Sequence, residues 1–232
     1  DYYLWLSYIP APHSIYKNVK KLPPAYCMTV PFSGEIKSIE KYWQLQFNPN
    51  HTIKINDWPA LAEARLKESV KAHLVSDVPF GAFLSGGIDS TLVVQYMAEQ
   101  LNQPVKAFTI SFEEDAFNEL PYAEQAAKIL GVEHHQEVVK PEALKILPDL
   151  VKHYGEPYAD SSAIPTYYVC RLARKHVTMV LSGDGGDEAF FGYPRYQQWL
   201  KYLNTRLNVP AWKALLLPLA HAINPERYSS LT

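Results

Sequence analysis

A short polar loop with two adjacent glycines, SGGIDS, runs from Ser85 to Ser90 between an apolar run and a segment with helical spacing. Gly86 and Gly87 let the backbone come close to a ligand, and the free N–H groups of the following helix favour an anion. Asp89 would repel a phosphate, so its carboxylate makes chemical sense if it holds a Mg²⁺ ion that bridges phosphates. The loop predicts a metal–phosphate site; the alternative is a tight turn in which Asp89 is only a charge at the helix start.

A second loop, SGDGGDE at residues 182–188, follows the apolar run 177–181. It combines glycines, which allow a ligand to come close, with acidic side chains. Asp187 could share Mg²⁺ with Asp89, because two carboxylates and phosphate oxygens suit that ion. The alternative is a glycine-rich turn whose acids cap the next helix, which the pattern places at residues 188–200.

The hydrophobic pattern from residue 57 onward alternates between strands and helices. Apolar runs predict strands at 78–84, 105–112, 133–139 and 177–181, and helical spacing predicts helices at 58–74, 88–101, 122–130, 142–154 and 163–175. Asp57 is expected to cap the first helix and Gly131 to end the third. Alternating strands and helices predict an α/β fold, a parallel sheet flanked by helices. Ligands of such sheets bind beyond the carboxyl ends of the strands, where both loops lie.

The first 56 residues differ in composition from the rest. They are rich in Tyr, Pro and Lys and show no helical period, and residues 20–30 and 36–47 favour extended structure. We expect residues 1–56 to be a linker region that packs on a domain formed by residues 57–232.

These motifs resemble a known family. Residues 83–90 (FLSGGIDS) look like the pyrophosphate loop of the ATP-pyrophosphatases, which split ATP between the α and β phosphates and make an adenylated intermediate. Residues 180–193 resemble the second signature of the asparagine synthetases, and residues 107–110 (AFTI) resemble the strand that contacts the adenosine. Residues 8–12 and 21–24 resemble the region just before the synthetase domain of that family.

The resemblance implies a particular set of site residues on a fold of the adenine nucleotide alpha hydrolase-like, PP-loop type. ATP and its pyrophosphate would contact Leu84, Ser85, Gly86, Gly87, Asp89, Ser90, Ile110, Ser182 and Gly183. Asp89 and Asp187 would bind Mg²⁺. Asp184 would be catalytic, at a position that is Glu in well-known members and that matters for forming the β-aspartyl-adenylate.

The resemblance also implies the activity, namely ATP-dependent amide formation through an acyl-adenylate. Aspartate would be the default acceptor, and ammonia would come from an N-terminal glutaminase domain that this chain lacks. Assembly of the enzyme into a homodimer is left open. Well-studied members hold aspartate with an arginine, but none lies between Tyr154 and Cys170. A different carboxylate acceptor and a non-catalytic nucleotide-binding module are therefore the alternatives. Residues 156–166 are either the acceptor pocket or a capping segment in which Ser161 or Ser162 caps the next helix.

The composition excludes several classes of function. A formal net charge of −2 with scattered basic residues argues against binding to nucleic acid or an anionic membrane, and no apolar run is long enough to span a bilayer. Cys27 and Cys170 are expected to be reduced core thiols of a cytoplasmic protein. The adjacent His134 and His135 would point to opposite faces of a strand, which favours an exposed strand end over a metal site.

The chain does not begin with Met. We expect it to be a piece of a longer protein, truncated at its C-terminus, with the catalytic lysine of the family beyond Thr232.

Overall fold

The computed structural model describes residues 2–112, 119–140 and 143–207. The chain divides into two compact units, Asp1–Gly183 and Asp184–Thr232, and each unit is described by itself.

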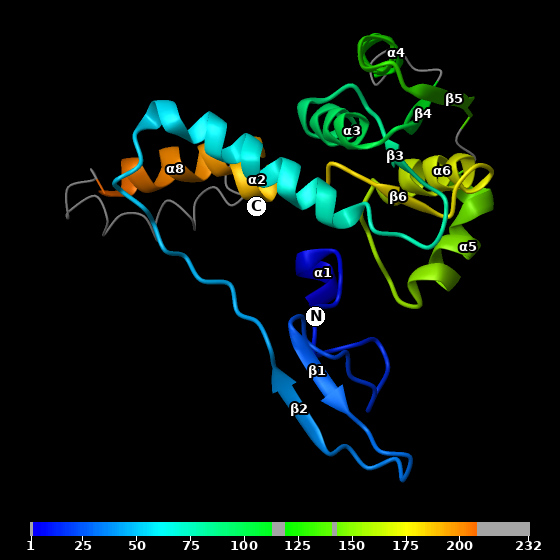
Figure 1. Cartoon of the computed structure of the whole chain (residues 1–232). Helices are drawn as coiled ribbons and strands as arrows, with labels where there is room; N and C mark the ends of the chain where they lie inside the picture. Colours follow the sequence, from blue (N-terminus) through cyan, green and yellow to red (C-terminus); the bar gives the residue numbers. More distant parts are fainter. Residues whose placement is uncertain (1, 113–118, 141–142, 208–232) are drawn as a thin grey trace, which may run out of the picture. The chain divides into compact units, whose positions relative to one another are not determined.

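The first unit is built on a parallel sheet of four strands in the order β5-β4-β3-β6. The strands are β3 (Phe80–Phe83), β4 (Lys106–Phe112), β5 (Glu133–Val139) and β6 (Met179–Leu181). The same unit includes the helices α2 (Trp58–His73), α3 (Ile88–Gln100), α4 (Leu120–Leu130), α5 (Ala143–Tyr154) and α6 (Ala163–Arg174). Helices α3 and α4 cover one face of the sheet and α5 and α6 the other, as Figure 1 shows. The predicted parallel sheet flanked by helices is confirmed.

The core lies on both faces of strand β4, whose side chains alternate between the two. Ala107 packs into the cluster beneath α3 and α4, whereas Phe108 packs against α6. Phe108, Leu84, Met97 and Val94 are the largest fully buried side chains. Burying each of them contributes about 1.5–3 kcal/mol, so the packing of α3 on β4 and the end of β3 stabilises the sheet.

The two predicted helix ends have different outcomes. Gly131 closes α4 in the left-handed conformation with φ of 63°, as the cap prediction requires. Asp57 occupies the N-cap position of α2, but its side chain makes no cap hydrogen bond. It is itself the last residue of a 3-10 turn, Ile55–Asp57, and has a helical ψ of −18°, which is not the extended geometry of a capping side chain.

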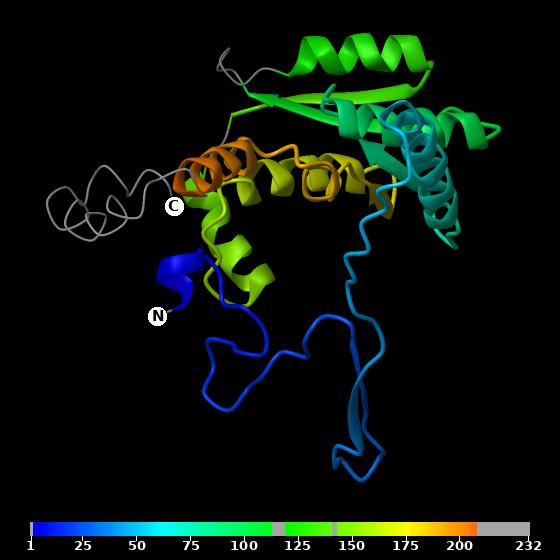
Figure 2. The same ribbon diagram turned by 90° about the vertical axis from the view of Figure 1, so that its left-hand side faces the viewer.

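The N-terminal part of the first unit contains a short helix α1 (Tyr2–Leu6) and two antiparallel strands, β1 (Tyr26–Thr29) and β2 (Ser38–Lys41). The extended segments are thus present but shorter than predicted (Figure 2). This part contacts the loop between α5 and α6: Lys21 pairs with Glu156, and the N–H of Ala159 donates to the carbonyl of Ser7 at 2.9 Å. The domain boundary at residues 56 and 57 stays a prediction.

The second unit contains α7 (Gly186–Phe190) and α8 (Pro194–Leu207). The single helix predicted at residues 188–200 is therefore wrong. The chain leaves the helix at Phe191, which has a positive φ of 58°, and Gly192 follows with its N–H on the carbonyl of Asp187 at 3.0 Å. A Cβ on Gly192 would lie 1.9 Å from Oδ1 of Asp187, so a larger residue here would displace the end of the Asp187 side chain.

The prediction that Cys27 and Cys170 are core thiols is also wrong, because both are free and exposed. Cys27 lies in the two-stranded sheet, whose strands are largely exposed, and Cys170 lies on α6. Within the described ranges, no helix is both long enough and apolar enough to cross a membrane.

Candidate nucleotide and pyrophosphate site

The two glycine-rich loops start at the same edge of the sheet. Strands β3 and β6 are neighbours and run parallel, with Phe80 opposite Met179 and Ala82 opposite Leu181. Their carboxyl ends therefore lie side by side, and the loops that begin at Ser85 and Ser182 leave from that edge. The topology gives the first loop the position where ligands bind in parallel sheets.

Hydrogen bonds within the first loop hold its shape. The hydroxyl oxygens of Ser85 and Ser90 are 2.9 Å apart, and the N–H of Ser85 donates to Oγ of Ser90 at 3.2 Å. The N–H of Gly87 donates to Oγ of Ser85, also at 3.2 Å. Ser90 is only 8% exposed, so its hydroxyl fixes the turn from inside rather than facing solvent.

The start of helix α3 presents backbone donors. The first bond within the helix runs from the N–H of Thr91 to the carbonyl of Gly87 at 3.1 Å. The N–H groups of Ile88, Asp89 and Ser90 thus have no acceptor within the helix, and together with the helix dipole they favour an anion. The Asp89 side chain, which is half-buried, belongs to the same turn. Backbone donors beside one carboxylate suit a phosphate that carries a divalent cation.

Gly86 and Gly183 are glycines because backbone lies against them. Gly86 has a positive φ of 80°, and a Cβ there would lie 2.6 Å from the N atom of Ala123 at the start of α4. A Cβ on Gly183 would lie 2.8 Å from the N atom of Ser90 and 3.0 Å from Cβ of Asp89. The start of the second loop therefore rests directly on the first loop, where a side chain would push the two apart.

The other predicted contact residues lie in different parts of the structure. Leu84 is 1% exposed and forms the buried base of the loop. The side chain of Ile110 packs against the buried residues of α5 and α6, and Ser182 is half-buried. Asp184 and Asp187 belong to the second unit, so the shared metal site of Asp89 and Asp187 and the catalytic role of Asp184 stay predictions.

The donor set of the first unit fits a Mg²⁺–nucleotide better than a metal ion alone. Across the described ranges, no three His, Cys, Asp or Glu side chains gather into a metal site. Mg²⁺ typically takes one or two carboxylates from the protein and completes its shell with water and substrate phosphates. A single carboxylate at Asp89, beside backbone N–H donors, matches that mode.

The segment at residues 156–166 is held by a side chain that the sequence pattern did not indicate. The N–H of Ser162 donates to Oδ1 of Asp160 at 2.8 Å, and this bond is the main reason why the pKa of the Asp160 carboxyl lies below its usual value. Ser162 is at the N-cap position of α6 without a side-chain cap bond. The prediction that Ser161 or Ser162 caps the helix is therefore wrong for Ser162, and the Asp160 carboxylate instead holds the turn just before α6.

The two adjacent histidines point to opposite faces of β5, as predicted, but neither is at an exposed strand end. Both are half-buried. His134 hydrogen-bonds Oγ1 of Thr109 at 2.8 Å, while the ring of His135 stacks on that of Phe108 with centroids 5.3 Å apart. The exposed-end interpretation failed because each ring finds a partner on the neighbouring strand β4.

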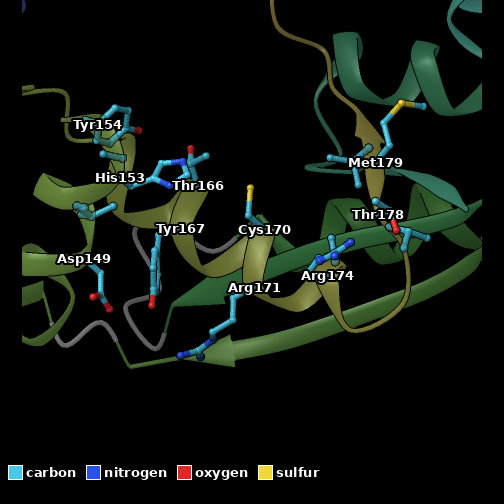
Figure 3. Close-up of a pocket in the computed structure, with 15 residues that line it drawn as sticks. Asp149, His153, Tyr154, Thr166, Tyr167, Cys170, Arg171, Arg174, Thr178 and Met179 are labelled. Atoms are coloured by element: carbon cyan, nitrogen blue, oxygen red, sulfur yellow. The ribbon is translucent and has the colours of Figure 1, made fainter. Parts of the chain in front are cut away.

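A cavity of about 580 Å³ lies elsewhere in the first unit, lined by α5, α6 and the residues around β6. Figure 3 shows Cys170 and Arg174 of α6 among its lining side chains, with Thr178 and Met179 at the start of β6. None of the lining residues is a predicted nucleotide, metal or catalytic residue, but Ala163 and Thr166 belong to the candidate acceptor segment 156–166. The C-terminal part of that segment therefore lines this cavity.

Comparison with known proteins supports the resemblance seen in the motifs. Residues 61–230 match the family described as asparagine synthase. The chain is 36% identical over 225 residues to asparagine synthetase (glutamine-hydrolyzing) 1 of Bacillus subtilis strain 168, covering 97% of this chain and 35% of that protein. It is 39% identical over 199 residues to a putative asparagine synthetase (glutamine-hydrolyzing) 2 of Methanocaldococcus jannaschii, covering 83% of this chain and 38% of that protein.

Among solved structures, NMN synthetase from Francisella tularensis is similar with a TM-score of 0.39 and 18% identity, over 61% of this chain and 59% of that chain.

The chain belongs to the asparagine synthase family, because the family match covers well over half of it. The family predicted from the two loops is confirmed. The chain spans about a third of the length of the relatives it matches, 35% and 38%.

Proposed function

We propose that this chain is the ATP-pyrophosphatase part of a ligase of the asparagine synthetase kind. The observation that supports this most is the contact of Gly183 with Asp89 and Ser90, which joins both signature loops of the family at the carboxyl edge of a parallel sheet. The proposed reaction forms an amide from a carboxylic acid through an acyl-adenylate, with ATP and Mg²⁺. Aspartate is the default acceptor, a glutaminase domain of the longer protein supplies ammonia, and the enzyme works in the cytoplasm.

The residues of the first loop have defined roles in this proposal. A substrate carboxylate oxygen attacks the α-phosphorus of ATP, and the bond from that phosphorus to the bridging oxygen of the β-phosphate breaks. The N–H groups of Ile88, Asp89 and Ser90 stabilise the charge on the departing pyrophosphate. Asp89 would hold Mg²⁺, which would neutralise phosphate charge when bound. Ammonia then attacks the acyl carbon, loses a proton, and displaces AMP.

Catalysis in this scheme rests on positioning and electrostatics rather than on a protein nucleophile. The bonds between Ser85 and Ser90 preform the loop, so its donors need no rearrangement when ATP binds. Ser182 and Gly183 would contact the AMP portion of the nucleotide, and Leu84 and Ile110 would line its site.

An exchange assay tests the role of Asp89. In the full-length protein, Asp89→Asn should lower aspartate-dependent ATP–pyrophosphate exchange on the order of 100-fold, as loss of a group that stabilises transition-state charge does. Asp77→Asn, an exposed aspartate just before β3, should exchange like the wild type. Unchanged exchange in Asp89→Asn would remove the metal role from this residue.

A different acceptor is the second candidate, because no arginine or lysine occurs at residues 155–169. The nearby Lys21 is already paired with Glu156 and the carbonyl of Ile9. A panel of carboxylic acids in the same exchange assay separates the candidates. Exchange with another acid but not with aspartate identifies a different acceptor, and ATP binding without exchange for any acid identifies a non-catalytic module.

A further inference from the structure

A buried threonine links three neighbouring strands directly below the pyrophosphate loop. Thr109 on β4 is 3% exposed. Its hydroxyl donates to the backbone carbonyl of Leu84, the residue that leads from β3 into the loop, and it lies 2.8 Å from Nε2 of His134 on β5. These bonds connect β3, β4 and β5 through side chains at the level where β3 ends.

The directions of these hydrogen bonds follow from the donors available. A carbonyl oxygen only accepts, so the single proton of the Thr109 hydroxyl points to Leu84. The hydroxyl oxygen must then accept from His134, which places a proton on Nε2 of the imidazole. His134 thus donates to Thr109, and Thr109 donates to Leu84, in one continuous chain of bonds.

The position of Leu84 explains why this chain of bonds matters. Its N–H still donates to the carbonyl of Phe108 at 3.0 Å, as part of the sheet. Beyond Leu84 the backbone turns away from β4 to form the loop, and its buried carbonyl needs a partner that the neighbouring backbone does not supply. The Thr109 hydroxyl is that partner, so it fixes the direction in which the loop leaves the sheet.

We propose that Thr109 and His134 are positioning residues for the loop Ser85–Ser90, holding its first residue through the carbonyl of Leu84. Its link to activity rests on the proposed function of this loop. Neither residue touches the substrate. They set the angle at which the N–H groups of Ile88, Asp89 and Ser90 meet the pyrophosphate, and a misplacement of a catalytic group by about 1 Å can cost on the order of 100-fold in rate.

Two threonine variants isolate the hydroxyl. Thr109→Val keeps the shape of the side chain and removes the hydroxyl, whereas Thr109→Ser keeps the hydroxyl. In the full chain with Mg²⁺, we expect Thr109→Val to weaken ATP binding about tenfold and Thr109→Ser to stay within about twofold of the wild type. Recovery by serine is a result that a loss of packing alone would not give.

A control variant separates positioning from general destabilisation. Val105→Ala removes buried side-chain volume just before the same strand begins, where Val105 is 2% exposed. It should lower the melting temperature and leave ATP affinity unchanged. The proposal is overturned if Thr109→Val binds ATP like the wild type, if Thr109→Ser does not recover, or if Val105→Ala loses the same affinity.

Hydrogen–deuterium exchange gives a readout that does not depend on ATP chemistry. In the ligand-free chain, Thr109→Val should raise amide exchange at residues 85–90, and Val105→Ala should not. If the wild type binds no ATP, the proposed function fails, and faster exchange in Thr109→Val still establishes the positioning. If Thr109→Val does not fold, His134→Gln and His134→Leu take its place. His134→Gln keeps a hydrogen-bond donor and should keep amide exchange at residues 85–90 slow, whereas His134→Leu should raise it. Equal exchange at residues 85–90 in the two variants overturns the proposal.

Discussion

Gly183 is the residue at which the two loops touch, and its missing side chain has a measurable consequence. In Gly183→Ala the new methyl group would lie 2.8 Å from the N atom of Ser90 and 3.0 Å from Cβ of Asp89. Since the closest neighbour is backbone, the loop itself must move, and we expect a loss of about 1–3 kcal/mol of stability and at least tenfold weaker ATP binding. Calorimetric titration with Mg²⁺–ATP and thermal unfolding measure the two effects.

Gly131→Asn is the matched control for that experiment. Gly131 lies at the far end of α4 with a positive φ of 63°, and a Cβ added there would meet no atom within 4 Å. Asn tolerates the left-handed conformation, so this variant should keep both stability and ATP affinity. If Gly183→Ala behaves in the same way, the two loops do not need their close contact.

His134 gives the fold a dependence on pH. Burial lowers the pKa of its imidazole, the nearby His135 lowers it further, and Glu124 opposes both. The folded protein therefore holds this proton less tightly than the unfolded chain, whose histidines titrate at about pH 6.5. The stabilisation is present above about pH 6.5 and is lost as the pH falls through the lower pKa of the folded state.

We therefore expect the free energy of unfolding of the wild type to fall more steeply between pH 7.5 and pH 5 than that of His134→Gln. Urea denaturation at both pH values measures this difference. His176, whose pKa is also lowered, is present in both proteins and cancels in the comparison. Equal slopes would show that His134 titrates alike in the folded and unfolded states.

At the scale of elements, one ion pair ties the N-terminal segment to the loop between α5 and α6. Lys21 contacts both Glu156 and the carbonyl of Ile9, and the two charged side chains are 35% and 16% exposed. Lys21→Met leaves the less exposed Glu156 without its cation. We expect a loss of about 1–2 kcal/mol and faster hydrogen exchange at residues 155–160.

Lys17→Met, an exposed lysine in the same segment, should change neither quantity. The loop concerned forms the first part of the candidate acceptor segment, residues 156–166, so its mobility bears on acceptor binding. Normal exchange at residues 155–160 in Lys21→Met would mean that the N-terminal segment does not hold this loop.

At the scale of the whole molecule, the chain covers about a third of the length of its relatives, and ATP binding is the property to test in the chain itself. Asp89 repels phosphate unless a cation lies between them. Removing Mg²⁺ with a chelator should therefore weaken ATP binding to the chain by at least tenfold. The loss of affinity on Mg²⁺ removal should be smaller in Asp89→Asn. Fluorescence titration with an ATP analogue measures the affinity of both proteins with and without Mg²⁺. Equal affinity with and without Mg²⁺ would exclude the proposed bridge.

The sequence by itself determined what depends on local pattern. Strand β5 was predicted with the bounds Glu133–Val139 that the structure has, and α3 begins at Ile88 as its helical spacing indicated. Side-chain periodicity reports which face of an element is buried, and the glycine and acidic residues of the two loops identified the family. Local signals were therefore enough for the strands and helices of the parallel sheet, the fold class and the family, but not for the break between α7 and α8.

Only the tertiary structure decided which residues far apart in the chain meet. The sequence did not indicate that Gly183 would rest on Ser90, or that Thr109 would join Leu84 to His134. It also missed the hydrogen bond from Ser162 to Asp160 just before α6 and the turn at Phe191. A hydrogen bond or a close backbone approach depends on distances between strands and loops that pack together, and those distances are set by strand order and register rather than by neighbouring residues in the sequence.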